Sequence, residues 1–94
     1  MEEKAKKIAS LFKILANEHR LLILCALMER PLSVGEIHEF TPGITLSALS
    51  QHLKQLKTAG IIDSDKKGMH VVYRIQDERV AVLMETVKEQ YCKE

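Results

Sequence analysis

The stretch SVGEIHEFTPGITLSALSQHLKQLKTAG, residues 33–60, decides the fold of this 94-residue chain. Ser33 and Glu36 have the spacing of a capping box, which predicts a short helix. After a Thr-Pro-Gly turn, Thr45 is placed to cap a longer helix over residues 46–59. Two helices joined by so short a turn predict a helix-turn-helix unit.

Patterns on both sides extend this unit. Period-2 alternation after Gly60 predicts two short strands, with Lys66-Lys67-Gly68 as the hairpin turn between them. Apolar residues at three- and four-residue steps predict further helices near both ends. The predicted elements are helices over residues 4–16, 18–29, 34–40 and 46–59, strands over 61–65 and 69–75, and a helix over 78–92. The expected fold is mainly α with a small β-hairpin, a winged helix-turn-helix in the order α-α-α-α-β-β-α, as one domain over residues 1–94.

The composition is that of a folded domain. Hydrophobic residues make up 46% of the chain and charged residues 29%, so intrinsic disorder is not expected. The longest apolar run, residues 21–28, is too short to cross a bilayer. The first residues, Met-Glu-Glu-Lys, lack the apolar segment of a signal peptide. We therefore expect a cytoplasmic protein without a membrane partner.

The charge is unevenly distributed although the formal net charge is only +1. Residues 45–76, which include the longer helix and the hairpin, hold five basic and two acidic side chains. The remainder of the chain is slightly acidic. A basic block in the helix-turn-helix region indicates an anionic partner that docks on one face.

The terminal helices carry more apolar surface than a small winged core needs. The helix over residues 18–29 is apolar almost all round, which predicts that it lies at the centre of the domain. An uncovered stripe on each terminal helix would mark an interface, so we expect a homodimer formed through the N- and C-terminal helices. The residues of the two stripes are Leu11, Phe12 and Leu15, and Val80, Leu83, Met84, Val87 and Tyr91.

Four segments resemble the ArsR/SmtB family, whose members are dimeric winged-helix bacterial repressors that release DNA when an inducer binds. They are LANEHRLLIL (15–24), LSVGEI (32–37), LSALSQHL (46–53) and AGII (59–62). The resemblance spans nearly the whole chain, and the Ser-x-x-Ser-Gln-His-Leu element is fairly specific for the recognition helix of that family. It implies that the partner is a double-stranded, pseudo-palindromic operator.

The resemblance also implies which residues contact DNA. Family members often have a polar residue where this chain has Leu46. His52 fits either a DNA-facing or a structural role, and the lysines and serines have the alternative of forming an ordinary solvated surface. The implied contacts are Thr45, Leu46, Ser47, Ser50 and Gln51 in the major groove, Lys54 and Lys57 on phosphates, Lys66, Lys67 and His70 on the wing, and His52.

The metal sites of the family are absent from this sequence, so no metal and no cofactor are expected. Ser33 and Gly35 stand where soft-metal sensors carry a Cys-x-Cys pair. The last-helix ligand positions of zinc and nickel sensors correspond to Asp77, Arg79, Gln90 and Lys93, which leaves one ligand of four. The four histidines form no i,i+4 pair, and His19 and His38 are interpreted as surface or packing residues.

Two cysteines resemble those of the dithiol branch of the family, the HlyU-like and BigR-like regulators. Cys25 and Cys92 stand on the second and last predicted helices, where that branch senses persulfide, sulfide-derived or oxidising species. The resemblance implies a redox switch whose inducer is sulfane sulfur or an oxidant. The alternatives are that Cys25 is a small buried hydrophobe and Cys92 an incidental thiol. Two questions stay open. One is whether the two cysteines are bridged by a disulfide or a polysulfide, and the other is whether the bridge forms within one protomer or between two.

Together these observations predict a transcriptional repressor whose DNA affinity is set by a thiol switch. The alternatives are an anti-repressor that displaces another DNA-binding protein, a constitutive DNA binder without an inducer, and a metal sensor with a non-standard site. An enzyme is not expected, because no nucleophile–base pair, phosphate loop or cofactor motif is present.

Overall fold

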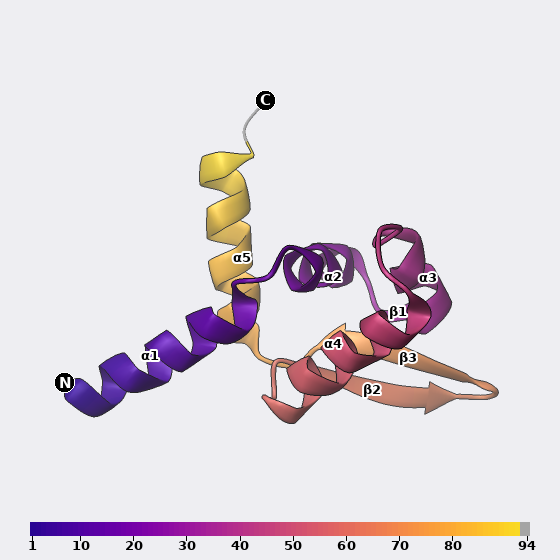
Figure 1. Cartoon of the computed structure of the whole chain (residues 1–94), viewed down its shortest axis with the longest axis horizontal. Helices are drawn as coiled ribbons and strands as arrows, with labels where there is room; N and C mark the ends of the chain where they lie inside the picture. The colour runs from indigo at the N-terminus through magenta and orange to yellow at the C-terminus, as the bar shows by residue number, and fades with distance from the viewer. Residues whose placement is uncertain (93–94) are drawn as a thin grey trace.

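The computed structural model describes residues 1–92 and has the predicted winged helix-turn-helix architecture, with one additional strand (Figure 1). The mainly helical fold with a small hairpin is confirmed. The elements in chain order are α1 (Glu2–Leu15), α2 (Glu18–Glu29), β1 (Leu32–Ser33), α3 (Val34–Glu39), α4 (Leu46–Thr58), β2 (Ile62–Lys67), β3 (His70–Ile75) and α5 (Glu78–Tyr91).

Side-chain caps begin four of the helices where the sequence predicted them. Asn17, Ser33, Thr45 and Asp77 each accept a hydrogen bond from a backbone N–H in the first turn of α2, α3, α4 and α5. Glu36 completes the capping box by accepting the Ser33 N–H at 2.9 Å. That hydrogen bond stabilises the charged carboxylate and lowers the pKa of Glu36.

Two glycines with positive φ determine where the wing begins and turns. Gly60, at φ 79°, follows α4, and Gly68, at φ 65°, lies in the hairpin turn. The predicted turn over Lys66-Lys67-Gly68 is wrong by two residues. Lys66 and Lys67 are the last residues of β2, and the turn consists of Gly68 and Met69. A two-residue turn matches the twist of a hairpin, so strand pairing continues to its end.

The sheet has three antiparallel strands in the order β1-β3-β2. Strand β1, in which Leu32 pairs with Tyr73 and Ser33 with Val72, was not predicted from the sequence. A strand of two residues shows no periodicity, and its partner lies about forty positions further along the chain. This strand ties the start of α3 to the wing.

The core lies between α2, α3, α4 and one face of the sheet. Helix α4 contributes Leu49, Leu53 and Leu56, each at most 1% exposed. The terminal helices add Leu15 from α1, and Val80 and Met84 from α5. The core therefore fixes α4 by one face and leaves the opposite face free.

Helix α2 is less central than its apolar sequence predicts. Ile23 and Leu24 are fully buried, but Leu21, Leu22 and Cys25 are exposed. The exposed side faces the space beside α1 and α5 rather than the core. The all-round apolar pattern thus combines one core face with one face that is open in the single chain.

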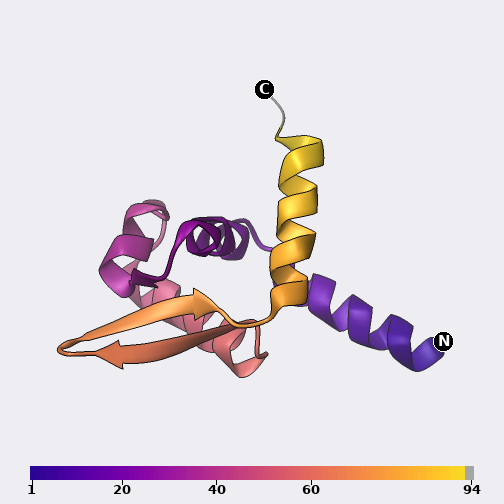
Figure 2. The ribbon, with the colours of Figure 1, turned by 180° about the vertical axis from the view of Figure 1, so that it is seen from behind.

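The terminal helices project from the winged core in two directions (Figures 1 and 2). Helix α1 extends away from the hairpin, and α5 rises from the end of β3. Half or more of the Ile8, Phe12, Val82 and Tyr91 side chains is exposed. Within residues 1–92, no helix combines the length and the apolar character that crossing a membrane requires.

Candidate DNA interface and thiol pocket

Helix α4 presents an outward polar face that is held by its buried leucines. Ser47, Ser50, Gln51 and Lys54 are all exposed on this face, which we call the DNA face. Thr45 and Leu46, at the start of the helix, are exposed as well. The Thr45 hydroxyl oxygen accepts the Ala48 N–H at 3.1 Å, so it caps the helix. The helix-turn-helix prediction thus places these side chains together at one surface, and their contact with DNA stays a prediction.

The hairpin places three further predicted DNA contacts near its free end. Lys66, Lys67 and His70 are exposed, and Lys67 is paired with His70 in the ladder. Figure 2 shows the hairpin extending beyond the helices as a free wing. Lys57, at the end of α4, donates from Nζ to the Ser64 Oγ of β2 at 2.7 Å. That hydrogen bond joins α4 to β2 of the wing.

The basic block is smaller than the sequence count suggests. Arg74 forms ion pairs with Asp65 at 2.8 Å and with Asp63 at 3.9 Å, all on the hairpin. Among residues 1–92, no carboxylate forms an ion pair with the remaining basic side chains of the block. The positive charge available to a phosphate backbone therefore comes from Lys54, Lys57, Lys66 and Lys67.

His52 has a structural contact that favours the second of its two predicted roles. The Arg20 Nε–H donates to His52 Nδ1 at 3.1 Å, and the His19 ring lies with its centroid 6.0 Å from the His52 ring. Because arginine keeps its proton, the Nδ1 atom of His52 must be unprotonated to accept this bond. Burial lowers the pKa of His52, and the charges of Arg20 and His19 lower it further.

Arg20 joins α1, α2 and α4 through contacts that were not predicted from the sequence. Beyond His52, its guanidinium donates to the Ile14 carbonyl of α1 at 3.1 Å and to the Gln55 side chain of α4. Arg20 stands on α2, five residues before Cys25. Nothing in the local sequence signals these contacts, because their partners lie 6, 32 and 35 positions away.

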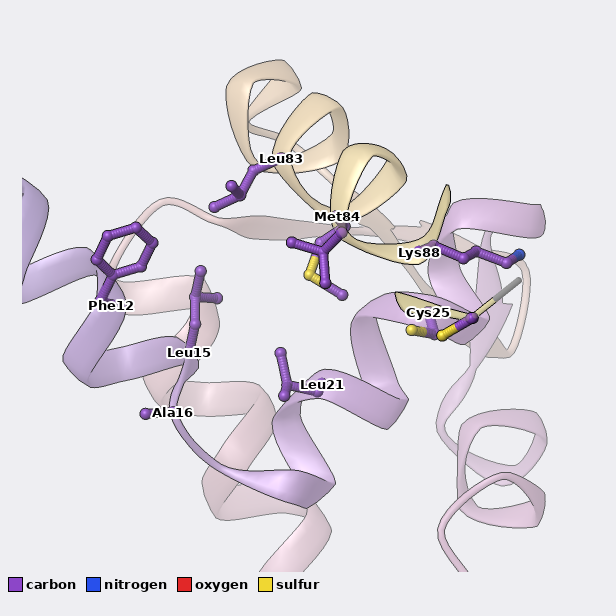
Figure 3. A pocket seen from close by; sticks show the side chains of 10 residues that line it. Phe12, Leu15, Ala16, Leu21, Cys25, Leu83, Met84 and Lys88 are labelled. Atoms are coloured by element: carbon purple, nitrogen blue, oxygen red, sulfur yellow. The ribbon is translucent and has the colours of Figure 1, made fainter. Parts of the chain in front are cut away.

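An apolar pocket of about 470 Å³ lies between α1, α2 and α5 (Figure 3). Both predicted sensing residues, Cys25 and Cys92, line it. In Figure 3, Lys88 lies beside Cys25 at one end of the pocket and Phe12 at the other. We call it the thiol pocket; its lining is Phe12, Leu15, Ala16, Leu21, Cys25, Leu83, Met84, Val87, Lys88 and Cys92.

The pKa of the Cys25 thiol is set by the side chains around the thiol pocket. Although Cys25 is exposed, the surrounding apolar side chains desolvate its sulfur and raise the pKa of the thiol. The Lys88 ammonium lowers that pKa, and negative charge on Cys92 raises it. The interpretation of Cys25 as a buried core residue is therefore wrong, since its thiol can be reached from the pocket.

The described residues contain no cluster of metal-ligating side chains. Residues 1–92 contain no group of three or more His, Cys, Asp or Glu side chains placed to hold a metal ion. Asp77, one family ligand position, is bound by the Arg79 guanidinium at 2.9 Å, which lowers the pKa of Asp77. Lys93, another such position, lies outside the described residues.

Comparison with known proteins identifies relatives over the whole chain. Residues 17–64 match the family model described as bacterial regulatory protein, arsR family. The transcriptional activator HlyU of Vibrio cholerae is 38% identical over 99% of this chain and 85% of its own length. The biofilm growth-associated repressor of Agrobacterium fabrum is 36% identical over 98% of this chain and 78% of its own.

Solved structures agree with these sequence matches. The structure of reduced HlyU from Vibrio cholerae superposes with a TM-score of 0.90, covering 99% of this chain and 97% of that one. A homodimeric winged helix-turn-helix DNA-binding domain from Mycobacterium bovis, 32% identical, superposes with a TM-score of 0.79 over 93% of this chain and 80% of that one.

Proposed function

This chain belongs to the ArsR family of bacterial regulatory proteins and is a DNA-binding transcriptional regulator, and we propose that a Cys25–Cys92 thiol switch controls its affinity for DNA. The observation that carries the switch is that one pocket, open in the single chain, is lined by both thiols. The resemblance to the dithiol branch supports the same assignment. The shared pocket supports bridging within one protomer over bridging between two.

DNA recognition is assigned to the DNA face of α4 and to the wing. A helix held by its apolar side presents Ser50 and Gln51, whose hydroxyl and amide groups suit base edges. Lys66 and Lys67 extend the positive surface to the neighbouring backbone. Enrichment of duplexes from a random pool tests this assignment. Enrichment of a palindromic sequence supports it, and binding without sequence preference contradicts it.

The proposed switch uses sulfane sulfur or an oxidant as its inducer. A thiolate of the pair attacks the outer sulfur of a hydropersulfide RSSH, giving a protein persulfide and RSH. The second thiol then attacks the inner sulfur of that persulfide, which forms a Cys25–Cys92 disulfide and releases H₂S. If both thiols are first persulfidated, the same release of H₂S leaves a trisulfide. Desolvation raises the pKa of the Cys25 thiol, and Lys88 beside it offsets part of that rise in favour of the thiolate that such attack requires.

Arg20 supplies a route from the pocket to the DNA face. A bridge between Cys25 and Cys92 ties α2 to the end of α5. Helix α2 also carries Arg20, whose guanidinium holds His52 and Gln55 of α4. A shift of α2 is therefore passed to the recognition helix, and DNA affinity falls if the bridged arrangement misplaces it.

Mass spectrometry and DNA binding together test the switch. Reduced protein is treated with a persulfide donor, with peroxide or with buffer, and free thiols are then alkylated. After treatment with the inducer, we expect neither thiol to be alkylated and the operator to be bound more weakly. The protein mass should show either a loss of two hydrogens or a gain of whole sulfur atoms. Cys25→Ser and Cys92→Ser proteins should bind the operator, and their affinity for it should not change on treatment. A normal response in either variant contradicts the switch.

A second copy of the chain is assigned to the apolar surface of α1 and α5. Phe12 and Val87 are about half exposed, and Tyr91 is almost fully exposed. Such a surface marks an interface, and two recognition helices then fit half-sites one helical turn apart. Sedimentation measures this directly. Phe12→Glu should shift the protein toward monomer, whereas Met69→Glu, at the exposed wing tip, should leave the dimer intact.

The direction of regulation is assigned as repression, and an enzymatic role is not proposed. A repressor and an activator are both found among the relatives, so an anti-repressor remains the second candidate. A reporter placed behind the selected operator separates them. Repression in a strain that holds no other protein bound to that operator supports direct repression. Activation that needs a competing DNA-binding protein supports the anti-repressor.

A further inference from the structure

Leu46 is an exposed apolar side chain at the start of the recognition helix. It is the first residue of α4, directly after the Thr45 cap, and 52% of it is exposed. It lies three residues before Leu49, which belongs to the core, and four residues before Ser50, which belongs to the DNA face. Residues three and four apart are neighbours on a helix, so Leu46 lies at the boundary between the two faces.

The core does not account for the exposed half of this side chain. Leu49, Leu53 and Leu56 fill the inner side of α4 and are fully buried. Helix-turn-helix proteins place the N-terminal residues of the recognition helix against base edges. Leu46 carries no donor or acceptor, so it cannot read a base edge through hydrogen bonds. The one apolar group that the major groove offers is the C5-methyl group of thymine.

We propose that Leu46 reads a thymine methyl group in each operator half-site and thereby determines specificity at that position. The inference rests on the proposed DNA-binding role of α4. The rest of α4 fits a DNA partner, because Lys54 and Lys57 lie further along the helix and supply positive charge for the flanking phosphates. The side chain would then be covered by DNA rather than by protein.

Deoxyuridine substitution isolates this contact, because it removes only the methyl group and leaves every hydrogen bond of the base pair. Each thymine of a duplex enriched by the wild-type protein is replaced in turn, in one half-site and then in both. Covering one methyl group by an apolar side chain corresponds to about a fourfold change in affinity, or about fifteenfold for two half-sites. We expect this loss at one thymine per half-site for the wild-type protein.

The Leu46→Ala protein should lose the sensitivity to that methyl group while still binding the duplex. Leu22→Ala, which shortens an exposed leucine of α2 outside the DNA face, the wing and the thiol pocket, should keep the full loss and serves as the matched control. Circular dichroism confirms that both variants are folded, and the wild-type comparison needs no variant at all.

Three results would overturn the inference. One is that no thymine-to-deoxyuridine change weakens wild-type binding by more than about 1.5-fold. Another is that the wild-type and Leu46→Ala proteins lose affinity equally, since the methyl group then acts through the DNA itself. The third is the failure of the wild-type protein to enrich any sequence, which refutes the proposed function and this inference together. The first two leave the proposed function intact.

Discussion

Removing the two wing lysines should flatten the salt dependence of DNA binding by a calculable amount. Lys66 and Lys67 are exposed near the end of the hairpin. Arg74 is held by Asp63 and Asp65, so we exclude it from the phosphate contacts. Each lysine that neutralises a phosphate releases counterions from DNA, and the affinity then falls as salt concentration rises.

The magnitude follows from the number of available lysines. Lys54, Lys57, Lys66 and Lys67 of each protomer give eight phosphate contacts in a dimer, and a slope of log K against log salt of about −7. Affinity should then fall by about 20,000-fold between about 50 and about 200 mM salt. The double variant Lys66→Ala/Lys67→Ala keeps four contacts, so its slope should be about −3.6 and its loss about 150-fold.

Fluorescence anisotropy of a labelled operator duplex measures the slope. Lys4→Ala/Lys6→Ala serves as the control, because it removes two exposed lysines from α1, outside the helix-turn-helix and the wing. The control should keep the wild-type slope. If the wing variant also keeps it, the wing does not contact phosphates. If the control flattens the slope as much, the attraction is a general charge effect without a defined surface.

Three further predictions concern single residues. Lys88→Ala should slow the alkylation of Cys25 at about pH 8, since the ammonium group of Lys88 lowers the pKa of that thiol. Peptide mass spectrometry gives the alkylation rate. An unchanged rate would contradict the electrostatic effect of Lys88. His52→Gln should lose less stability than wild type between about pH 7.5 and about pH 5.5 in urea unfolding. Because the pKa of His52 is lowered in the folded chain, the unfolded chain binds a proton more readily as pH falls. The contribution of His52 to the unfolding free energy is therefore fully present above about pH 6.5 and is lost below it. Gly60→Ala should cost about 1 kcal/mol of unfolding free energy because its φ of 79° disfavours a side chain, whereas Gly35→Ala, inside α3 and with room for a Cβ, should be neutral or stabilising in the same assay.

Local sequence signals predicted the helices well. The Asn17, Ser33, Thr45 and Asp77 caps act within three residues of their own positions, so the sequence alone contains both partners of each hydrogen bond. Likewise, the leucines of α4 repeat at helical spacing and predict which face is buried. Local patterns therefore predicted α4, the helix to which we assign DNA recognition, to within one residue.

Features that depend on distant partners were not predicted. Strand β1 exists only because β3 pairs with it, and the Arg74 ion pairs form only because the hairpin register places Asp65 nearby. The Arg20 contacts require the packing of three helices. The meeting of Cys25 and Cys92 at one pocket was suggested by family resemblance, since 67 positions separate them and no local pattern connects them.

The position of α2 gives the proposed thiol bridge a physical connection to the DNA face. Ile23 and Leu24 fix one side of this helix in the core, where close packing resists gradual deformation. Cys25 faces the thiol pocket, and Arg20 is bonded to His52 on the recognition helix. A covalent bond at Cys25 therefore either displaces α2 as a rigid unit or leaves it in place, because the packed core resists a partial deformation of the helix. In the proposed switch, the Arg20 contacts to His52 and Gln55 would convert such a displacement into a change at α4.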